Sequence, residues 1–219
     1  MNPEVIRNIA LMMPALLFSL CVHEYAHAWA ATRLGDSTPS SEGRLTLSPA
    51  SHVDLLGSII FPILLILSGG MVFGWAKPVR FSPVNFRGVS MRRGAALTAV
   101  AGPLSNILLA LGAALALRLV FTLELDDSDF LGQLLQQLFY LNALLAVFNL
   151  VPLPPLDGSY LLPASMDGLK ATLQQYSFLI FAVIFFIPLV GGRTLGSFVL
   201  GPVTTVLIWC IAKLAGFGS

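Results

Sequence analysis

The residues best suited to chemistry form the pentapeptide His23-Glu24-Tyr25-Ala26-His27, inside the apolar stretch 9–31. Residues four apart share one face of a helix, so His23 and His27 offer two imidazole nitrogens to a single metal ion. Glu24 follows about 100° around the helix, where its carboxylate can accept a proton from metal-bound water. Ionisable groups at bilayer depth are costly, so three of them in one apolar stretch indicate a functional site.

A third protein ligand must come from elsewhere in the chain, because catalytic zinc sites use three protein ligands and a water. The candidates are His52, which is the one remaining histidine, or a carboxylate. Asp157 is the stronger candidate, since it follows a run of three prolines that removes backbone donors and ends an apolar stretch (Pro152, Pro154 and Pro155). The alternative for Asp157 is an acid at a helix end that faces water.

Three motifs together resemble the site-2 protease family of intramembrane zinc metalloproteases: His23-Glu24-x-x-His27, Gly102-Pro103-x-x-Asn106 and Asn149…Pro155-Leu156-Asp157-Gly158. The resemblance extends over most of the chain, as far as Asp157, and is to the short bacterial members that lack PDZ and CBS domains. It implies one Zn²⁺ per chain, held by His23, His27 and Asp157. It also implies that Glu24 is the catalytic glutamate and that Asn149 lies near the scissile carbonyl.

The composition is that of an integral membrane protein. The chain has 219 residues, of which 56% are hydrophobic and only 11% charged, and its mean hydropathy is +0.84. A soluble domain has roughly a quarter of its residues charged. The net charge of +1, without a basic stripe, argues against nucleic acid as a partner.

Apolar runs of membrane length predict an all-α integral membrane fold, a multi-span helical bundle with four to six membrane segments. We interpret the chain as a single intramembrane metalloprotease domain over residues 1–219, with a catalytic core at about 8–160 and C-terminal segments at about 173–215. Two segments with alternating apolar residues, 44–48 and 74–81, predict short re-entrant or interfacial β-strands; ordinary interfacial loops are the alternative. The apolar runs cover 9–31, 55–73, 97–121, 130–151, 178–190 and 195–215.

The charge distribution predicts an orientation. The connection 77–93 holds five basic residues, which places it on the cytoplasmic side. The run 97–121 then leads outward and the run 130–151 leads back inward. If Asp157 and His23 share one ion, the first span also runs inward and 55–73 forms a re-entrant hairpin. We expect a multi-pass protein of the plasma membrane, the inner membrane of a bacterium.

The predicted function is hydrolysis of peptide bonds within or near transmembrane helices of substrate proteins, with zinc-activated water and Glu24 as the base. The expected partners are transmembrane protein substrates and the lipid bilayer, and the oligomeric state is left open. The strand-like segments would bind an unwound substrate. The alternative is a metal-ion transporter or channel with an intramembrane His/Glu/Asp site, and a haem or di-iron redox protein is weaker still, because three histidines are few.

The sequence leaves alternative roles open for three further polar residues. Asn106 suits a hydrogen bond between helices, with Gly102 permitting close packing, and a direct active-site role is the alternative. Asn149 has a catalytic role by the resemblance and a helix–helix hydrogen bond as the alternative. His52 is interpreted as an interfacial histidine, or as a residue that lines a water path or binds substrate.

Overall fold

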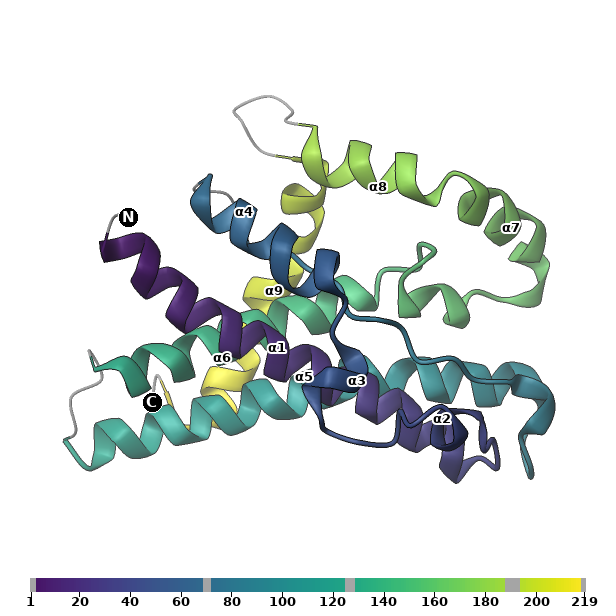
Figure 1. Ribbon diagram of the computed structural model, residues 1–219, viewed down its shortest axis with the longest axis horizontal. Coiled ribbons are helices and arrows are strands. Elements are labelled where there is room, and N and C mark those ends of the chain that lie inside the picture. Colours follow the sequence, from purple (N-terminus) through teal and green to yellow (C-terminus); the bar gives the residue numbers. More distant parts are fainter. Residues whose placement is uncertain (1–2, 69–71, 125–128, 188–193, 218–219) are drawn as a thin grey trace.

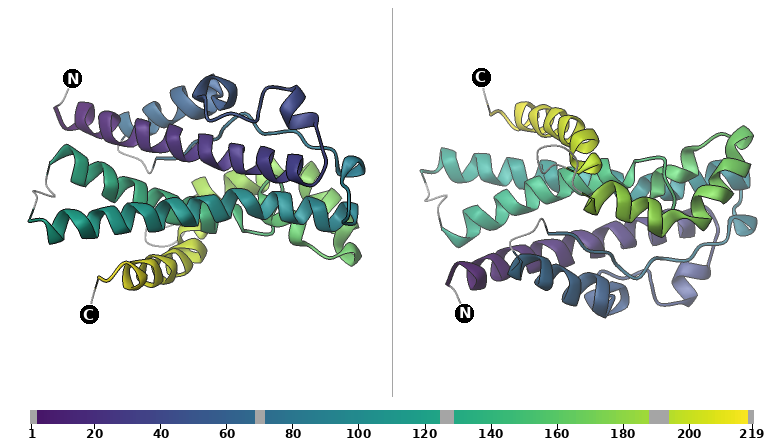
Figure 2. Two further views of the ribbon diagram at one scale, coloured as in Figure 1. Left: turned by 90° about the horizontal axis from the view of Figure 1, so that it is seen from below. Right: turned by 90° about the horizontal axis from the view of Figure 1, so that it is seen from above.

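The computed structural model describes residues 3–68, 72–124, 129–187 and 194–217 (Figure 1). Four helices within this part of the chain are long and apolar enough to cross a membrane: α1 (Pro3–Arg33), α5 (Met91–Thr122), α6 (Phe130–Asn149) and α9 (Leu195–Leu214). Helices α1, α5 and α6 lie side by side and pack against one another. Figure 2 shows α9 on the opposite side of the α5–α6 pair from α1. The predicted all-α, multi-span architecture is therefore confirmed.

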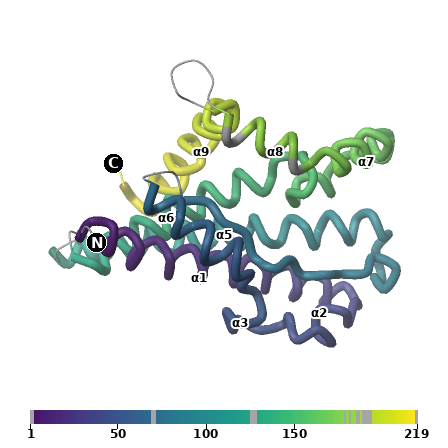
Figure 3. The backbone as a smooth tube through the Cα atoms, turned by 45° about the horizontal axis from the view of Figure 1, so that its top comes forward, coloured from purple at the N-terminus to yellow at the C-terminus, as the bar shows by residue number. Residues whose placement is uncertain are grey.

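Shorter elements connect and cover these long helices, as the tube in Figure 3 shows. The connection between α1 and α5 packs along α1, and α8 packs against α9. These elements are α2 (Thr38–Ser41), α3 (Pro49–His52), the π-helix η1 (Leu55–Ile60), α4 (Phe61–Leu67), the 3-10 helices η2 (Pro83–Asn85), η3 (Asp157–Leu161) and η4 (Ala164–Met166), α7 (Asp167–Gln175) and α8 (Ser177–Phe186).

Two of the six predicted apolar runs form shorter helices. The run 55–73 begins with the six-residue η1, which continues into the seven-residue α4, and residues 69–71 lie outside the described residues. The run 178–190 contributes to the ten-residue α8, and its last residues, 188–190, are also outside the described part. The backbone amide of Lys77 donates to the carbonyl of His52 at 2.8 Å. The residues on either side of the 55–73 run therefore lie next to each other.

The structure does not support the predicted short β-strands, since the described residues contain no sheet. Segment 44–48 forms turns and bends. Segment 72–82 is extended, as its alternating pattern suggested, but a strand needs a second extended backbone beside it. Three alternate amides of this segment instead bond to separate acceptors: Trp75 to the Gly57 carbonyl, Lys77 to the His52 carbonyl and Val79 to the Glu24 carboxylate.

Small residues allow α5 and α6 to approach closely. Without a hydrophobic driving force between helices in lipid, close backbone packing and polar contacts hold membrane helices together. Both kinds of contact occur here, because the alanines of the interface are preceded along the helices by Asn106 and Asn142, each fully buried. The alanines are Ala110, Ala113, Ala114 and Ala143.

A buried carboxylate anchors the far end of segment 72–82 to the end of α1. The Asp36 side chain is fully buried and accepts hydrogen bonds from the Ser82 amide at 2.6 Å and from Asn85 Nδ2 at 2.9 Å. It also accepts from the amide and the hydroxyl of Thr38. Burial alone raises the pKa of Asp36, but these hydrogen bonds outweigh it and hold the pKa below its ordinary value of 3.8.

Candidate metal centre

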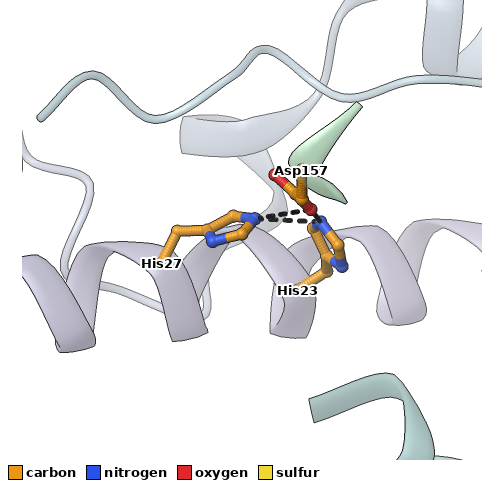
Figure 4. A group of neighbouring side chains, drawn as sticks. All are labelled: His23, His27 and Asp157. Atoms are coloured by element: carbon orange, nitrogen blue, oxygen red, sulfur yellow. Dashed lines mark hydrogen bonds and ion pairs between the residues drawn. The ribbon is translucent and has the colours of Figure 1, made fainter. Parts of the chain in front are cut away.

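Helix α1 presents two imidazoles on its buried face. His23 and His27 are both 6% exposed, and their rings meet edge to face with centroids 4.6 Å apart. Their Nε2 atoms are 3.0 Å apart. The i, i+4 spacing read from the sequence therefore does bring the two rings together, and Figure 4 shows both leaving the same helix.

The third residue of the group, Asp157, reaches the histidines because the chain turns back sharply after α6. Its Oδ2 atom lies 3.2 Å from His23 Nε2 and 3.3 Å from His27 Nε2 (Figure 4). Gly158 makes this turn possible, since a Cβ atom there would collide with the carbonyl oxygens of Leu150 and Val151. The structure thus brings together the three residues that the resemblance implied as zinc ligands.

The other ring nitrogens determine which atoms face Asp157. His27 Nδ1 lies 2.7 Å from the Thr98 carbonyl oxygen, and His23 Nδ1 lies 2.6 Å from Asn106 Oδ1. Carbonyl oxygens accept hydrogen bonds and do not donate them, so each Nδ1 carries a hydrogen. In the neutral imidazoles, both Nε2 atoms then direct lone pairs towards Asp157, as histidine ligands of metals do.

Three electron-pair donors that face one another provide a place for a cation between them. Asp157 Oδ2 is buried and has no hydrogen-bond donor among the described residues. Tetrahedral zinc, with ligand bonds of roughly 2.0–2.2 Å, sets its ligand atoms about 3.3–3.6 Å apart. The separations of 3.0, 3.2 and 3.3 Å are close to that geometry. The His₂Asp group therefore fits a catalytic zinc site, which keeps its fourth position for water.

Helix α5 lies against the imidazoles because residue 102 has no side chain. A Cβ atom on Gly102 would lie 2.6 Å from His23 Cε1 and closer still to the His27 ring. Real Cβ contacts are not that short, so the imidazole rings or the helix would have to shift. Gly102 thus permits the close approach that the sequence suggested.

Glu24, the predicted base, is buried beside the histidines and touches the extended segment. Its Oε2 atom accepts a hydrogen bond from the Val79 amide at 2.8 Å. A carboxylate accepts through either oxygen, so this bond positions the group and leaves Oε1 for another partner. Segment 72–82 therefore contacts the candidate base directly.

Two other residues singled out from the sequence lie outside the three-residue group. The Asn149 amide donates to the Leu145 carbonyl of its own helix at 3.0 Å, so its catalytic role stays a prediction. His52 is only 1% exposed, and its Nε2 lies 2.7 Å from the Thr46 carbonyl. His52 thus fastens the 46–52 loop rather than facing the water interface.

Sequence reasoning missed Ser19 and Asn142, which lie behind the histidines. Asn142 binds both Asn106 and Ser19, at 2.8 Å in each case. The available signal was the Asn142 amide within the apolar stretch 130–151, since a polar side chain in a membrane helix commonly bonds across helices. Asn106 bonds to Asn142 of a neighbouring helix and to His23, as the predicted helix-packing bond requires; its direct role in an active site stays a prediction.

Comparison with known proteins identifies the relatives of this chain. A protein of Bacillus subtilis (strain 168) named "Putative zinc metalloprotease YwhC" is 39% identical over 204 residues, which are 87% of this chain and 86% of that protein. Proteins named "Putative zinc metalloprotease Rip2" are 32% identical in Mycolicibacterium smegmatis (81% of this chain, 67% of that protein) and 31% identical in Mycobacterium tuberculosis H37Rv (85% and 70%). No family model and no solved structure matches.

The chain belongs to the site-2 protease family of zinc metalloproteases. With four membrane-length helices in the described part of the chain, it is a multi-pass membrane protein. Zinc is the metal that both the family and the His₂Asp group imply. The relatives do not favour the metal-ion transporter.

Proposed function

We propose that this protein is an intramembrane zinc metalloendopeptidase that hydrolyses peptide bonds within or near the transmembrane helices of substrate proteins. The observation that supports this most is the meeting of His23, His27 and Asp157 at a buried point among membrane-length helices. In this proposal the protein spans the plasma membrane. The five basic residues of the connection 77–93 favour the cytoplasmic side for this end of the bundle.

In this proposal the zinc ligands are His23 Nε2, His27 Nε2 and Asp157 Oδ2. When bound, zinc supplies a Lewis acid that acidifies a water molecule and polarises the substrate carbonyl. The backbone carbonyl of Thr98 and the side chain of Asn106 hold the two rings with their lone pairs directed at one point. The chain thereby fixes the ligand geometry before any substrate arrives.

Glu24 moves the proton. Its carboxylate takes the proton of the attacking water and later delivers it to the leaving amine, so one group acts first as base and then as acid. The hydrogen bond from the Val79 amide holds Oε2 and leaves Oε1 for this exchange. Asn149 would assist the substrate oxyanion with the amide hydrogen that its bond to Leu145 does not use.

Substrate binding is assigned to segment 72–82. A transmembrane helix hides its peptide bonds, so it must unwind before it can be cut, and an unwound segment pairs readily with an extended backbone. The amides of Trp75, Lys77 and Val79 are already bonded on one side of the segment. Its other edge, opposite these three bonds, is where an unwound substrate would add.

The test is zinc analysis combined with cleavage of a model transmembrane substrate by the purified protein in lipid vesicles. Glu24→Gln should keep about one zinc per chain and lose roughly 10²–10⁴-fold in cleavage rate, the usual contribution of general acid–base catalysis. Glu4→Gln is the matched control at the start of the same helix, and it should cleave normally. A zinc-loaded wild type that moves zinc across the vesicle membrane and cuts nothing would show the transporter to be correct.

A further inference from the structure

A chain of buried hydrogen bonds crosses three helices and ends on a metal-ligand histidine. Its members are Ser19 on α1, Asn106 on α5 and Asn142 on α6, and all three are 0% exposed. Asn106 Nδ2 donates to Asn142 Oδ1 at 2.8 Å, and Asn106 Oδ1 lies 2.6 Å from His23 Nδ1. At the other end, two backbone carbonyls terminate the chain: Asn142 Nδ2 donates to Leu138, and the Ser19 hydroxyl donates to Ala15.

These terminal carbonyls fix the direction of every bond in the chain. A carbonyl only accepts, so Asn142 must turn its NH₂ group to Leu138 and Ser19 must turn its hydroxyl hydrogen to Ala15. The lone pairs of Ser19 Oγ then face Asn142 Nδ2, at 2.8 Å. Asn142 is held by two acceptors, so its oxygen must be the atom that faces Asn106.

The same logic continues to the histidine. Because Asn142 presents an oxygen, Asn106 must present its NH₂ group to Asn142 and its oxygen to His23. An oxygen beside His23 Nδ1 requires a hydrogen on that nitrogen. The neutral ring is therefore the Nδ1–H tautomer, with the Nε2 lone pair free.

We propose that Asn142 is a positioning residue that, through Asn106, selects the metal-binding tautomer of His23. The inference deepens the proposed function, because it rests on His23 being a zinc ligand. Asn142 acts from two hydrogen bonds away, whereas the tautomer of His27 is fixed at once by the Thr98 carbonyl. An inverted Asn106 amide would favour a hydrogen on His23 Nε2, and a protonated Nε2 has no lone pair for a metal.

The decisive variant is Asn142→Leu, which removes the acceptor that orients Asn106. The Asn106 amide can then turn its NH₂ group towards His23 and stabilise the wrong tautomer. Zinc affinity, measured by chelator competition, should fall about 10–100-fold, the usual effect of losing an outer-shell partner of a histidine ligand. The ¹⁵N resonances of His23 in the zinc-free protein should show the Nε2–H tautomer, which a purely structural role would not produce.

A second substitution should reverse the loss. Asn106→Asp places a carboxylate beside His23, and a carboxylate has no donor group to turn towards the ring. In the Asn142→Leu background, Asn106→Asp should therefore restore zinc affinity to within a few-fold of the wild type, together with the Nδ1–H resonance. If the double variant binds zinc as weakly as Asn142→Leu alone, packing rather than tautomer selection explains the loss and the inference is wrong.

Thr204→Val is the matched control, because Thr204 is a buried polar residue of α9 whose hydroxyl has no hydrogen-bond partner among the described residues. It should leave zinc affinity unchanged, and an equal loss in this variant and in Asn142→Leu would overturn the proposal. If Asn142→Leu does not fold, Asn142→Ala removes the same acceptor with a smaller side chain. Unchanged affinity and an unchanged His23 resonance in that variant would also overturn it.

None of these measurements uses substrate, so the two proposals fail separately. A wild type that binds zinc through the Nδ1–H tautomer, loses affinity in Asn142→Leu and cleaves nothing would refute the protease and leave tautomer selection intact. A wild type that cleaves normally and an Asn142→Leu variant that binds zinc normally would do the reverse.

Discussion

Two parts of the molecule enclose the metal centre and are held in different ways. The helical floor, made of α1, α5 and α6, is joined by bonds between side chains, such as those of Asn106 with His23 and Asn142. The extended cover, residues 72–82, is joined through its own backbone amides. The packing of the floor therefore depends on the identity of its side chains, whereas the attachment of the cover depends mainly on its backbone conformation.

The largest expected effect comes from crowding the floor. Gly102→Ala puts a methyl group where the two imidazole rings lie, so the rings must move and their shared point is lost. Zinc affinity should fall by about 100-fold or more, the upper end of what outer-shell changes cause. Chelator competition measures this loss.

Gly112→Ala is its control on the same helix, since a Cβ atom there meets nothing within 4 Å. This variant should bind zinc normally and gain up to about 1 kcal/mol of helix stability, seen in thermal unfolding. Equal zinc affinity in both variants would mean that the missing side chain at residue 102 is not needed to position the two imidazoles.

An intermediate effect is expected where the cover meets the floor. Val79→Pro removes the amide hydrogen that binds Glu24, and a hydrogen bond to a charged group contributes about 1.5–3 kcal/mol. Cleavage should slow by about 10–100-fold while zinc content stays normal. Val79→Ala keeps the amide and should cleave at nearly the wild-type rate. If the two variants slow cleavage equally, the side chain rather than the backbone makes the contact.

The smallest effect is expected at the anchor of the cover. Asp36→Asn replaces an accepting oxygen by an NH₂ group that faces other hydrogen-bond donors. Local stability should fall by on the order of 1–3 kcal/mol, and zinc affinity should not change. Limited proteolysis near 82–87 should become faster, and Glu42→Gln, an exposed change in the adjacent turn, should have no such effect.

The same anchor has a definite pH dependence. Because the folded-state pKa of Asp36 is lowered, its carboxylate stabilises the fold fully at pH values above the ordinary pKa of 3.8. This stabilisation is lost as the pH falls through the lower folded-state pKa. Proteolysis at 82–87 in the wild type should therefore accelerate only in that acidic range. Acceleration between pH 5 and 7 would contradict the assignment.

The same contrast explains what the sequence predicted. The long helices followed from hydropathy and the pairing of His23 with His27 from motif spacing, while the resemblance to a family supplied Asp157; all three signals are properties of side chains. The bond from the Val79 amide to Glu24 had no such signal, because every residue except proline has that amide. The predicted strand in 74–81 was wrong for the same reason: alternation predicts an extended chain, and it does not say what pairs with it. The predicted strand in 44–48 was wrong in its local conformation, because that segment forms turns and bends.

The ligand set has a consequence for how the protein is made. His23 lies on the first membrane helix and Asp157 follows the third long one, so translation delivers them far apart in time. A nascent chain cannot hold zinc with these ligands until α6 has entered the bilayer and the turn behind it has closed. The three-residue group is therefore complete only after the third long helix and the turn behind it have formed.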